Sequence, residues 1–481
     1  MGAIPILLIV WPALAAAVLP CIQDRRVRGG AVYGAAVGVM VLASALLAAW
    51  MAGGAGRVEL YVETELIDHA MLLGELVLMG LIILLSVRHR KYPIILLSAG
   101  QTLLVAWSEL TDPVSPAAHM RVDGLAMLLC IIAAFVGGFI CIYAVGYMKA
   151  YHQHHEDYID RSGFFFSMLF LFLAAMFGLV LSENLVWMYF FWEITSVVSF
   201  LLIGYTRTEE AVSNSFRALW MNLLGGLGFA VAIAYAAAVN DTVQLTQVVA
   251  SGAAIPVVLL AFAALTKSAQ MPFSSWLLGA MVAPTPSSAL LHSATMVKAG
   301  VYLLIRLAPA LAGTLSGVMV SFIGGFTFIV CSMMAIAQND GKKVLAFSTI
   351  SNLGLIVACA GIGVEETIWA AVLLTIFHSV AKSLLFQAVG SIENSLGSRD
   401  IESMHGLLLR LPKLTYLMGI GIAGMYLAPF GMLISKWVAL KSFVDADNYL
   451  LVLFLAYGSA TTMLYWTKWL SKLVSLHHTK E

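Results

Sequence analysis

Charged residues are scarce in this chain: of its 481 residues only 11% are Asp, Glu, Lys or Arg, whereas 61% are hydrophobic. Soluble domains carry about 25% charged residues, so this composition excludes a soluble globular protein. The mean hydropathy of +0.93 and the long apolar runs predict an integral membrane protein built from helices, and not a β-barrel. The formal net charge is zero, which gives no reason to expect a nucleic-acid partner.

Cysteine is also sparse, and it forms no pattern. The five cysteines stand singly in apolar segments, at Cys21, Cys130, Cys141, Cys331 and Cys359. Without a CxxC pair or a Cys/His cluster, we expect neither a metal ion nor an iron–sulfur cluster. The sequence also lacks a P-loop and a GxGxxG motif that follows a strand. We therefore expect no cofactor in this chain.

The apolar runs predict many membrane spans. About 20 apolar residues cross a bilayer as one helix, and on that basis we predict about fifteen spans without an intervening soluble domain. The segment Met1–Leu19 lacks a basic region and a cleavage site, so it is the first span and not a signal peptide. The predicted limits are 3–21, 30–52, 70–87, 92–108, 124–148, 164–182, 185–205, 215–238, 254–282, 287–309, 316–337, 343–364, 367–391, 412–438 and 448–470.

Basic residues concentrate in alternate loops. They occur in the first loop and then in every second loop, whereas the second loop is acidic. Basic loops stay in the cytoplasm, so we predict a multi-pass protein of the cell inner (plasma) membrane with its N-terminus outside and its C-terminus inside. The basic loop residues are Arg25, Arg26, Arg28, Arg88, Arg90, Lys91, Lys149, Arg161, Arg207, Lys342, Lys343, Arg399, Arg410 and Lys413.

One stretch concentrates titratable groups at membrane depth. Between Leu265 and Arg306 the chain is apolar, yet it carries Lys267, His292 and Lys298. A charge at the centre of a membrane helix costs about 2.5–3.5 kcal/mol on insertion scales. Because of that cost, titratable groups inside the membrane indicate an ion or proton pathway.

Prolines predict two broken spans. Pro272 follows Lys267 by five residues, and Pro429 precedes Lys436 by seven. A proline removes a backbone donor and clashes with the preceding turn, and open backbone at membrane depth is tolerated only inside protein or beside water. Two broken, lysine-bearing spans five apart in helix order predict inverted repeats of five helices each, at about 164–309 and 316–470.

Glu193 and Lys267 are the first candidate relay residues. Only hydroxyl groups accompany Glu193 in NLVWMYFFWEITSVVSFLLIGY, and acids inside the membrane are functional by default. Its alternative role is assembly, paired with a helix end or a partner subunit. Burial disfavours the charged form of Lys267 and a nearby carboxylate favours it, so this lysine is suited to load and release a proton. Its alternative role is a permanent ion pair.

The other candidates lie on three later spans. His292 and Lys298 are six residues apart, about 120° around a regular helix, so water or a local bulge has to connect them. His378 and Lys382 are i and i+4 on one helix face, where two basic groups cannot both easily hold a proton in low dielectric. Lys436, beside the second break, is the positional counterpart of Lys267.

Several ordered motifs resemble one family of ion-translocating subunits. The likeness runs from about Asp123 to Trp437 and covers YAVGYM, GLVLSENLVWMYFFWE, KSAQMPFSSWLLGAMVAPTPSSALLHSATMVKAGVYL, DGKKVLAFSTISNLG, FHSVAKSLLF, GSRD and the segment from PFG to Lys436. These motifs are similar to those of the antiporter-like subunits of respiratory complex I, multi-subunit cation/proton antiporters and energy-converting membrane-bound hydrogenases. The resemblance implies an all-α polytopic bundle of about fourteen helices with two inverted five-helix repeats, each with a broken helix.

The resemblance also implies roles for individual residues. Glu193 matches the family's glutamate of the first repeat, and Lys267 matches its broken-helix lysine. The bridging groups of the next helix match His292 and Lys298. In the second repeat the central lysine matches Lys382, with His378 one turn before it, and the terminal lysine or glutamate matches Lys436. The full set indicates an active unit for ion or proton relay.

The N-terminal part departs from the family pattern. Two spans at 70–108 are extra, and one of them carries a buried acid, Glu75, for which we expect a packing or partner contact. We predict N-terminal helices in residues 1–122, the ion-translocating core in 123–470 and a cytoplasmic tail in 471–481. No counterpart of the family's final helix follows Leu470, so we expect a short member or part of a longer chain. The extra spans most resemble the hydrogenase-linked branch.

The predicted function is translocation of protons or sodium ions by a subunit without its own redox centre. We expect it to be driven by a redox-active complex, with other membrane subunits and a peripheral iron–sulfur module as partners. One alternative is a multi-subunit Na⁺/H⁺ antiporter without redox partners. Another is a structural membrane anchor, which the costly buried charges disfavour.

Overall fold

The computed structural model describes residues 2–62, 65–111, 114, 116–154, 158–427 and 430–475. Within these ranges the chain is an all-α bundle, as predicted. Fourteen helical stretches are long and apolar enough to cross a membrane. The long helices are α1 (Ile4–Val18), α2 (Arg25–Ala52), α3 (Glu65–Arg88), α4 (Tyr92–Thr111), α5 (Gly124–His154), α6 (Ser162–Leu181), α7 (Leu185–Ile203), α8 (Glu209–Asn240), α10 (Ala254–Lys267), α13 (Met296–Leu311), α14 (Leu315–Ile336), α15 (Gly341–Ile362), α16 (Glu365–Leu396), α18 (Pro412–Tyr426), α19 (Gly431–Asp445) and α20 (Tyr449–Val474).

Short elements connect or interrupt these helices. They are the 3₁₀ turns η1 (Leu19–Cys21), η2 (Ala280–Val282) and η4 (Glu402–Met404), the π-helical turn η3 (Leu290–Ala294), the helices α9 (Leu245–Ser251), α11 (Ser275–Gly279), α12 (Thr285–Ala289) and α17 (Leu407–Arg410), and the strands β1 (Val58–Leu60) and β2 (Met120–Val122). The two strands pair antiparallel with Val58 opposite Val122.

The predicted break near Pro272 is confirmed. Helix α10 ends at Lys267 after only 14 residues, and α11 begins at Ser275. Between them, Ala269 has a positive φ of 54°. This broken segment is the one predicted span that does not appear among the fourteen long helices. In the second half, α18 ends at Tyr426 and α19 begins at Gly431, while Pro429 itself lies outside the described residues.

Several helices extend beyond their predicted apolar limits. Helix α8 begins at Glu209, and α2 begins at Arg25, five or six residues earlier than hydropathy indicates. Side-chain caps explain both starts: Thr208 accepts a hydrogen bond from Ala211 N, and Asp24 accepts from Arg26 N and Val27 N. Caps of this kind satisfy the free amides of a first turn, so a helix can begin in polar sequence.

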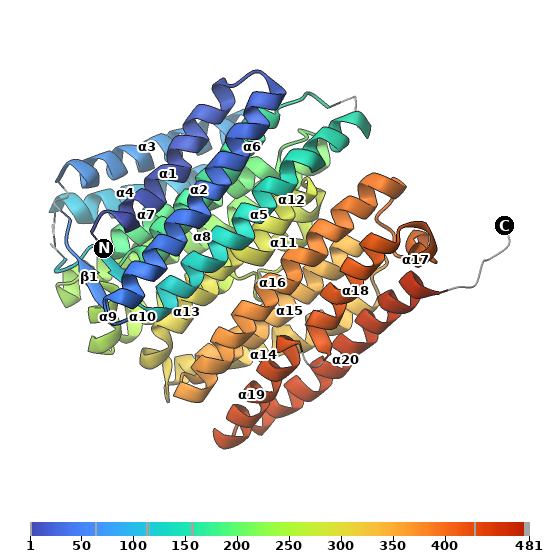
Figure 1. The fold of residues 1–481 in the computed structure, drawn as a ribbon. Coiled ribbons are helices and arrows are strands. Elements are labelled where there is room, and N and C mark those ends of the chain that lie inside the picture. Colours follow the sequence, from blue (N-terminus) through green and yellow to red (C-terminus); the bar gives the residue numbers. More distant parts are fainter. Residues whose placement is uncertain are drawn as a thin grey trace.

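The helices lie side by side in one bundle, with the N-terminal helices at one side and α18–α20 at the opposite side (Figure 1). One large apolar core runs through nearly the whole bundle. A second, smaller cluster joins the α3–α4 hairpin to α7 and α8 through Ile82, Ile94, Phe200, Phe216 and their neighbours. The hairpin that the sequence marks as extra is therefore packed on the helix that carries Glu193. The inverted relation of the two repeats and the division at residue 123 stay predictions.

Candidate functional site

Lys267 is the last residue of α10 and is fully buried. Its ammonium donates hydrogen bonds to the carbonyl oxygen of Trp192 over 3.0 Å and to Ser196 Oγ over 2.8 Å. Nζ also lies 4.8 Å from the ring centroid of Trp192. The break after Lys267 leaves it at the negative end of the helix dipole, which stabilises a cation. The broken helix thus provides carbonyl, hydroxyl and dipole partners for a buried ammonium that makes no direct ion pair in the described chain.

Glu193 lies on the same helix as these partners, α7, and is 5% exposed. Its Oε2 accepts a hydrogen bond over 3.0 Å from the amide of Gln101 on α4, while its Oε1 has no protein partner among the described residues. Glu193 and Lys267 form no direct ion pair in the described chain; Lys267 instead contacts the residues of α7 that flank Glu193. The predicted pair is therefore adjacent, but not in direct contact.

The α3–α4 hairpin contributes two polar residues beside Glu193. Gln101 is 1% exposed, and Glu75 on α3 is 4% exposed. The Glu75 carboxylate lies within electrostatic range of both Glu193 and Glu109, and its Oε2 has no partner in the described part of the chain. The sequence predicts a packing or partner contact for Glu75. In the structure it lies in the polar surroundings of Glu193, and a packing or partner contact stays a prediction.

Lys298 of α13 and His378 of α16 are in direct contact, with 3.0 Å between Lys298 Nζ and His378 Nδ1. Both are fully buried, and 80 residues separate them in the sequence. This contact joins the two predicted repeats. Because a neutral imidazole nitrogen accepts a hydrogen bond from an ammonium, the pair needs only one of the two groups to be charged.

His292 lies in the π-helical turn η3, immediately before α13. Both of its ring nitrogens are buried and without a partner among the described residues. Its ring packs between Trp276 and Phe386, with centroids 6.4 Å and 5.8 Å away. π-Turns inside helices are frequent at functional sites. Here the turn is a local bulge, one of the two options that the spacing of His292 and Lys298 leaves open, although no hydrogen bond joins the two side chains.

The two predicted relay lysines of the second repeat, Lys382 and Lys436, lie over aromatic rings. Lys382 donates to the carbonyl oxygen of Leu345 over 3.0 Å, and its Nζ is 5.2 Å from the ring centroid of Trp466. Lys436 Nζ is 5.6 Å from the centroid of Phe328. No carboxylate of the described residues pairs with either lysine. An aromatic face attracts a cation by about 0.5–2 kcal/mol, so it favours the charged form without fixing it as an ion pair does.

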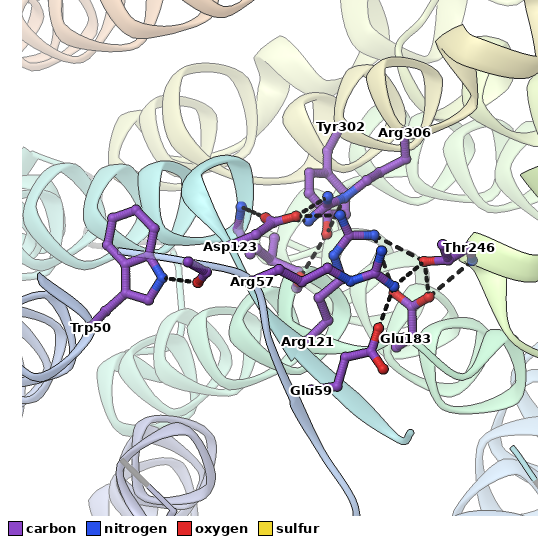
Figure 2. Close-up of polar contacts among 12 residues, drawn as sticks. Trp50, Arg57, Glu59, Arg121, Asp123, Glu183, Thr246, Tyr302 and Arg306 are labelled. Atoms are coloured by element: carbon purple, nitrogen blue, oxygen red, sulfur yellow. Dashed lines mark hydrogen bonds and ion pairs between the residues drawn. The ribbon is translucent and has the colours of Figure 1, made fainter. Parts of the chain in front are cut away.

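An ion-pair network at one end of the bundle fixes α13, the helix of Lys298 (Figure 2). Arg306 makes two hydrogen bonds to the carboxylate of Asp123, one of them 2.7 Å long. Tyr302, one turn earlier, donates to the carbonyl oxygen of Val180 over 2.7 Å. Burial alone would raise the pKa of Asp123, but the hydrogen bonds and charges of Arg306 and Arg121 hold it well below its usual range.

The same network extends to β1, β2 and α9 (Figure 2). Arg121 bridges Asp123, at 2.6 Å, and Glu183, at 3.7 Å. Glu183 also accepts a hydrogen bond from Thr246 N over 2.9 Å. Arg121 stands outside the basic loops that indicate the membrane orientation, and the sequence indicates no partner for it. In the structure it holds together three segments that surround the end of α13.

A second polar cluster lies on α12, α15, α16 and α5. Lys342 Nζ is 3.3 Å from Glu393 Oε2, and Thr285 Oγ1 is 3.2 Å from the same oxygen. Tyr147 reaches Thr285 over 3.3 Å. Lys342 is 2% exposed, although its place in a basic loop predicts a solvated charge. It is a structural cation that joins the two halves of the chain.

No set of three His, Cys, Asp or Glu side chains in the described ranges is arranged to hold a metal ion. The buried cysteines Cys130, Cys141, Cys331 and Cys359 are free thiols. The lysine, histidine and glutamate side chains of the site can exchange protons and contact ions.

Two family models match this chain. The family described as "NADH:quinone oxidoreductase/Mrp antiporter, TM" matches residues 182–462, and "NADH-Ubiquinone oxidoreductase (complex I), chain 5 N-terminus" matches residues 107–161. The first match covers more than half of the chain and includes all seven predicted relay residues.

Relatives with similar sequences are components of antiporters by name. The probable K(+)/H(+) antiporter component of Rhizobium meliloti that is named as the A/B subunit is 41% identical over 303 residues, which are 61% of this chain and 30% of the relative. The A1 subunit of the Na(+)/H(+) antiporter of Staphylococcus haemolyticus is 34% identical over 355 residues, 68% of this chain and 43% of the relative. This chain therefore spans less than half the length of these relatives.

Two solved structures share the fold. A chain of the archaeal membrane-bound sulfane sulfur reductase, a respiratory membrane complex, superposes with a TM-score of 0.78 at 17% identity, covering 98% of this chain and 88% of that one. A chain of the Mrp complex from Dietzia sp. DQ12-45-1b superposes with a TM-score of 0.68 at 29% identity, covering 83% of this chain and 47% of that one. With the matched residues 182–462, this multi-pass membrane chain belongs to the NADH:quinone oxidoreductase/Mrp antiporter transmembrane family.

Proposed function

We propose that the chain is an ion-translocating subunit of a multi-subunit membrane complex, in which a row of buried titratable side chains relays protons or sodium ions. The observation that carries the proposal is the 3.0 Å contact between Lys298 and His378. It connects α13 of the first predicted repeat to α16 of the second, at full burial. A buried basic pair without a counter-ion is costly, and a purely structural role gives no reason to keep it.

The proposed relay begins at Glu193 and ends at Lys436. A charge change near Glu193 alters the balance that keeps Lys267, at the end of α10, protonated against its hydrogen-bond partners on α7. Loss or gain of that proton changes the field at His292 and Lys298, and the shared hydrogen bond passes the change to His378 and Lys382. Lys436 then exchanges with one side of the membrane. Buried polar atoms without a protein partner, such as those of His292, suit connection by water.

Lys267 provides the sharpest test of this proposal. Lys267→Ala removes the proton carrier, whereas Lys267→Arg keeps a positive charge that does not titrate in proteins. A relay fails with both variants, while a structural cation tolerates Arg far better than Ala. Ion movement is measured with a pH-sensitive dye in inverted membrane vesicles that contain the whole complex, and assembly is checked on a native gel. We expect both variants to assemble and both to lose translocation.

The control is Lys441→Ala, because Lys441 is exposed on the surface of α19 and, within the described residues, forms an ion pair only with Asp445. It should translocate ions at the wild-type rate. An assembled Lys267→Arg complex that also runs at the wild-type rate would mean that Lys267 is a structural cation, and the relay would be wrong.

Two versions of the proposed function differ in the energy source that drives ion translocation: electron transfer or a cation gradient. We propose a redox-driven complex whose partners are other membrane subunits and a peripheral iron–sulfur module, with no redox cofactor in this chain. The second candidate is a cation/proton antiporter, and it is favoured by the names of the relatives at 34–41% identity. Copurified iron–sulfur proteins together with donor-dependent proton movement support the first. A Na⁺ or K⁺ pulse that moves protons without an electron donor supports the second.

The proposed topology has the N-terminus outside and the C-terminus in the cytoplasm. It rests on the basic loops that begin with Arg25, Arg26 and Arg28 and on the positive-inside rule. Reporter proteins fused to each end test it: an alkaline phosphatase fusion should be active only at the N-terminus. The structural-anchor alternative is tested by the Lys267 variants, because an anchor needs no titratable lysine.

A further inference from the structure

A cavity of about 590 Å³ lies where the C-terminal ends of α3 and α7 meet the N-terminal ends of α6 and α8. Its walls are mainly leucine and phenylalanine side chains, among them Leu85, Phe164 and Phe216. The volume is in the range of about 300–1,000 Å³ that is usual for small-molecule sites. None of the seven relay residues lines it, so this cavity is a separate site.

Four basic side chains also line the cavity: Arg88 and His89 at the end of α3, Arg161 before α6 and Arg207 before α8. Throughout the described ranges, no carboxylate pairs with any of them. Asp160 is next to Arg161 in the chain, yet it pairs with Arg25 at 2.7 Å.

Two of these guanidinium groups act on each other. Arg161 donates a hydrogen bond to the carbonyl oxygen of Tyr205 and lies over the rings of Phe164 and Tyr205, at 5.6 Å and 5.1 Å. Burial and the positive charge of Arg207 both lower the pKa of Arg161. Two like charges that face a shared cavity repel each other, and a bound anion would remove this repulsion.

From this combination we propose that the cavity binds an anionic phospholipid, with its phosphate between Arg88, Arg161 and Arg207 and an acyl chain along the apolar wall. Guanidinium groups match phosphate geometry with paired hydrogen bonds. Basic pockets between membrane helices on the cytoplasmic side bind lipid head groups, and the proposed topology puts this end of the bundle on that side. The bound lipid would also contact α3 of the hairpin together with α6, α7 and α8, and would thereby stabilise their packing.

The walls favour a lipid over free phosphate. A phosphate ion would use only the arginines and would leave the leucines and phenylalanines without a role. An acyl chain buries them, and burial contributes about 25 cal/mol per Å² of apolar surface. His89 packs on Phe216 with ring centroids 5.3 Å apart, so the basic and apolar parts of the cavity are continuous.

The test uses the full-length chain in its complex, purified in detergent and delipidated. Phosphatidylglycerol, phosphatidylcholine or inorganic phosphate is then added, and both the thermal midpoint and lipid adducts in native mass spectrometry are measured. We expect phosphatidylglycerol alone to raise the midpoint and to form an adduct. The combined variant Arg88→Gln/Arg161→Gln/Arg207→Gln should bind it at least about tenfold more weakly.

Two controls separate this site from general charge attraction. The variant Arg26→Gln/Lys343→Gln/Lys413→Gln removes the same charge from other basic loops and should bind as the wild type does. Leu85→Trp fills the cavity without changing charge and should weaken binding. If the triple arginine variant does not fold, the single variant Arg207→Gln is used in its place, because Arg207 is exposed. We then expect a smaller loss of phosphatidylglycerol binding.

Three results would overturn the proposal. They are equal phosphatidylglycerol binding by the wild type and the arginine variant, stabilisation by inorganic phosphate to the same extent, or a partner subunit cross-linked to Arg88 or Arg207 in the intact complex. Because adducts and thermal midpoints are measured without ion transport, the outcome does not depend on the relay mechanism.

Discussion

The amide of Gln101 donates a 3.0 Å hydrogen bond to the carboxylate of Glu193. Gln101 is on α4, in the hairpin that the sequence marks as extra, and Glu193 is on α7. Both side chains are almost completely buried. In the described chain this is the one hydrogen bond that reaches the carboxylate of Glu193, so the hairpin contributes directly to the state of the first relay residue.

The first prediction follows from this bond. Gln101→Leu removes the donor and leaves both carboxylate oxygens without a protein partner. Hydrogen bonds to charged groups contribute about 1.5–3 kcal/mol, so we expect the charged form of Glu193 to be disfavoured and translocation to fall by roughly tenfold or more. Vesicle transport assays measure the rate, and a native gel reports assembly. Leu103→Ala, at an exposed position of the same helix, is the control. Wild-type transport by Gln101→Leu would contradict a role for the hairpin.

The sequence predicts features whose signals are local. A lysine in an apolar run marks a buried charge wherever the run folds, so Lys267, Lys382 and Lys436 are found without a structure. The break after Lys267 is predictable because Pro272 acts on the backbone beside it. Fourteen of the fifteen predicted spans correspond to long apolar helical stretches, and the remaining one is the segment that breaks after Lys267, because the length of an apolar run is a direct signal of a span.

Contacts between residues that are far apart in the sequence leave no local signal in it. Lys298 and His378 are 80 residues apart, and Gln101 and Glu193 are 92 apart. Neither pairing follows from any periodicity. The sequence places Lys342 among the cytoplasmic charges because hydropathy cannot show that Glu393 lies 3.3 Å away. The spacing of His292 and Lys298 gives the π-helical turn only as one option, since water could also fill the gap.

The second prediction concerns pH and the Asp123–Arg306 pair. The folded-state pKa of Asp123 lies below its unfolded value of about 3.9. Its contribution to stability is therefore fully present above that value and is lost as the pH falls toward the folded-state pKa. Asp123→Asn should lower the thermal midpoint at pH 7, with a loss of stability smaller than the about 3–5 kcal/mol that breaking a fully buried pair costs, because Asp123 and Arg306 are only partly buried. The difference in thermal midpoint between the variant and the wild type should be constant from pH 8 to 6 and should become smaller below about pH 4.

Thermal unfolding of the detergent-purified complex across this pH range measures this difference. Asp445→Asn is the matched control, since it removes a pair with Lys441 that lies on the exposed surface, where solvent screens ion pairs and they contribute little to stability. A difference that persists unchanged at pH 3 would show that the Asp123 carboxylate charge is not what stabilises α13.

The last prediction concerns Gly226 on α8, whose lack of a side chain makes room for the Glu193 site. A Cβ at this position would lie 2.5 Å from Glu193 Oε1 and 2.7 Å from Gln101 Oε1. Alanine normally favours a helix over glycine by about 1 kcal/mol, so Gly226→Ala should form α8 readily while it displaces the carboxylate and weakens its bond to Gln101.

We expect Gly226→Ala to assemble normally and to translocate ions much more slowly than the wild type. The matched control is Gly146→Ala on α5, where a Cβ would meet no atom within 4 Å, so this change should leave transport intact. Because neither substitution alters charge or removes a titratable group, a difference between them measures the effect of displacing the Glu193 carboxylate and the Gln101 amide beside it. Equal, wild-type rates in both variants would mean that the relay does not depend on where Glu193 lies, and the proposed first step would be wrong.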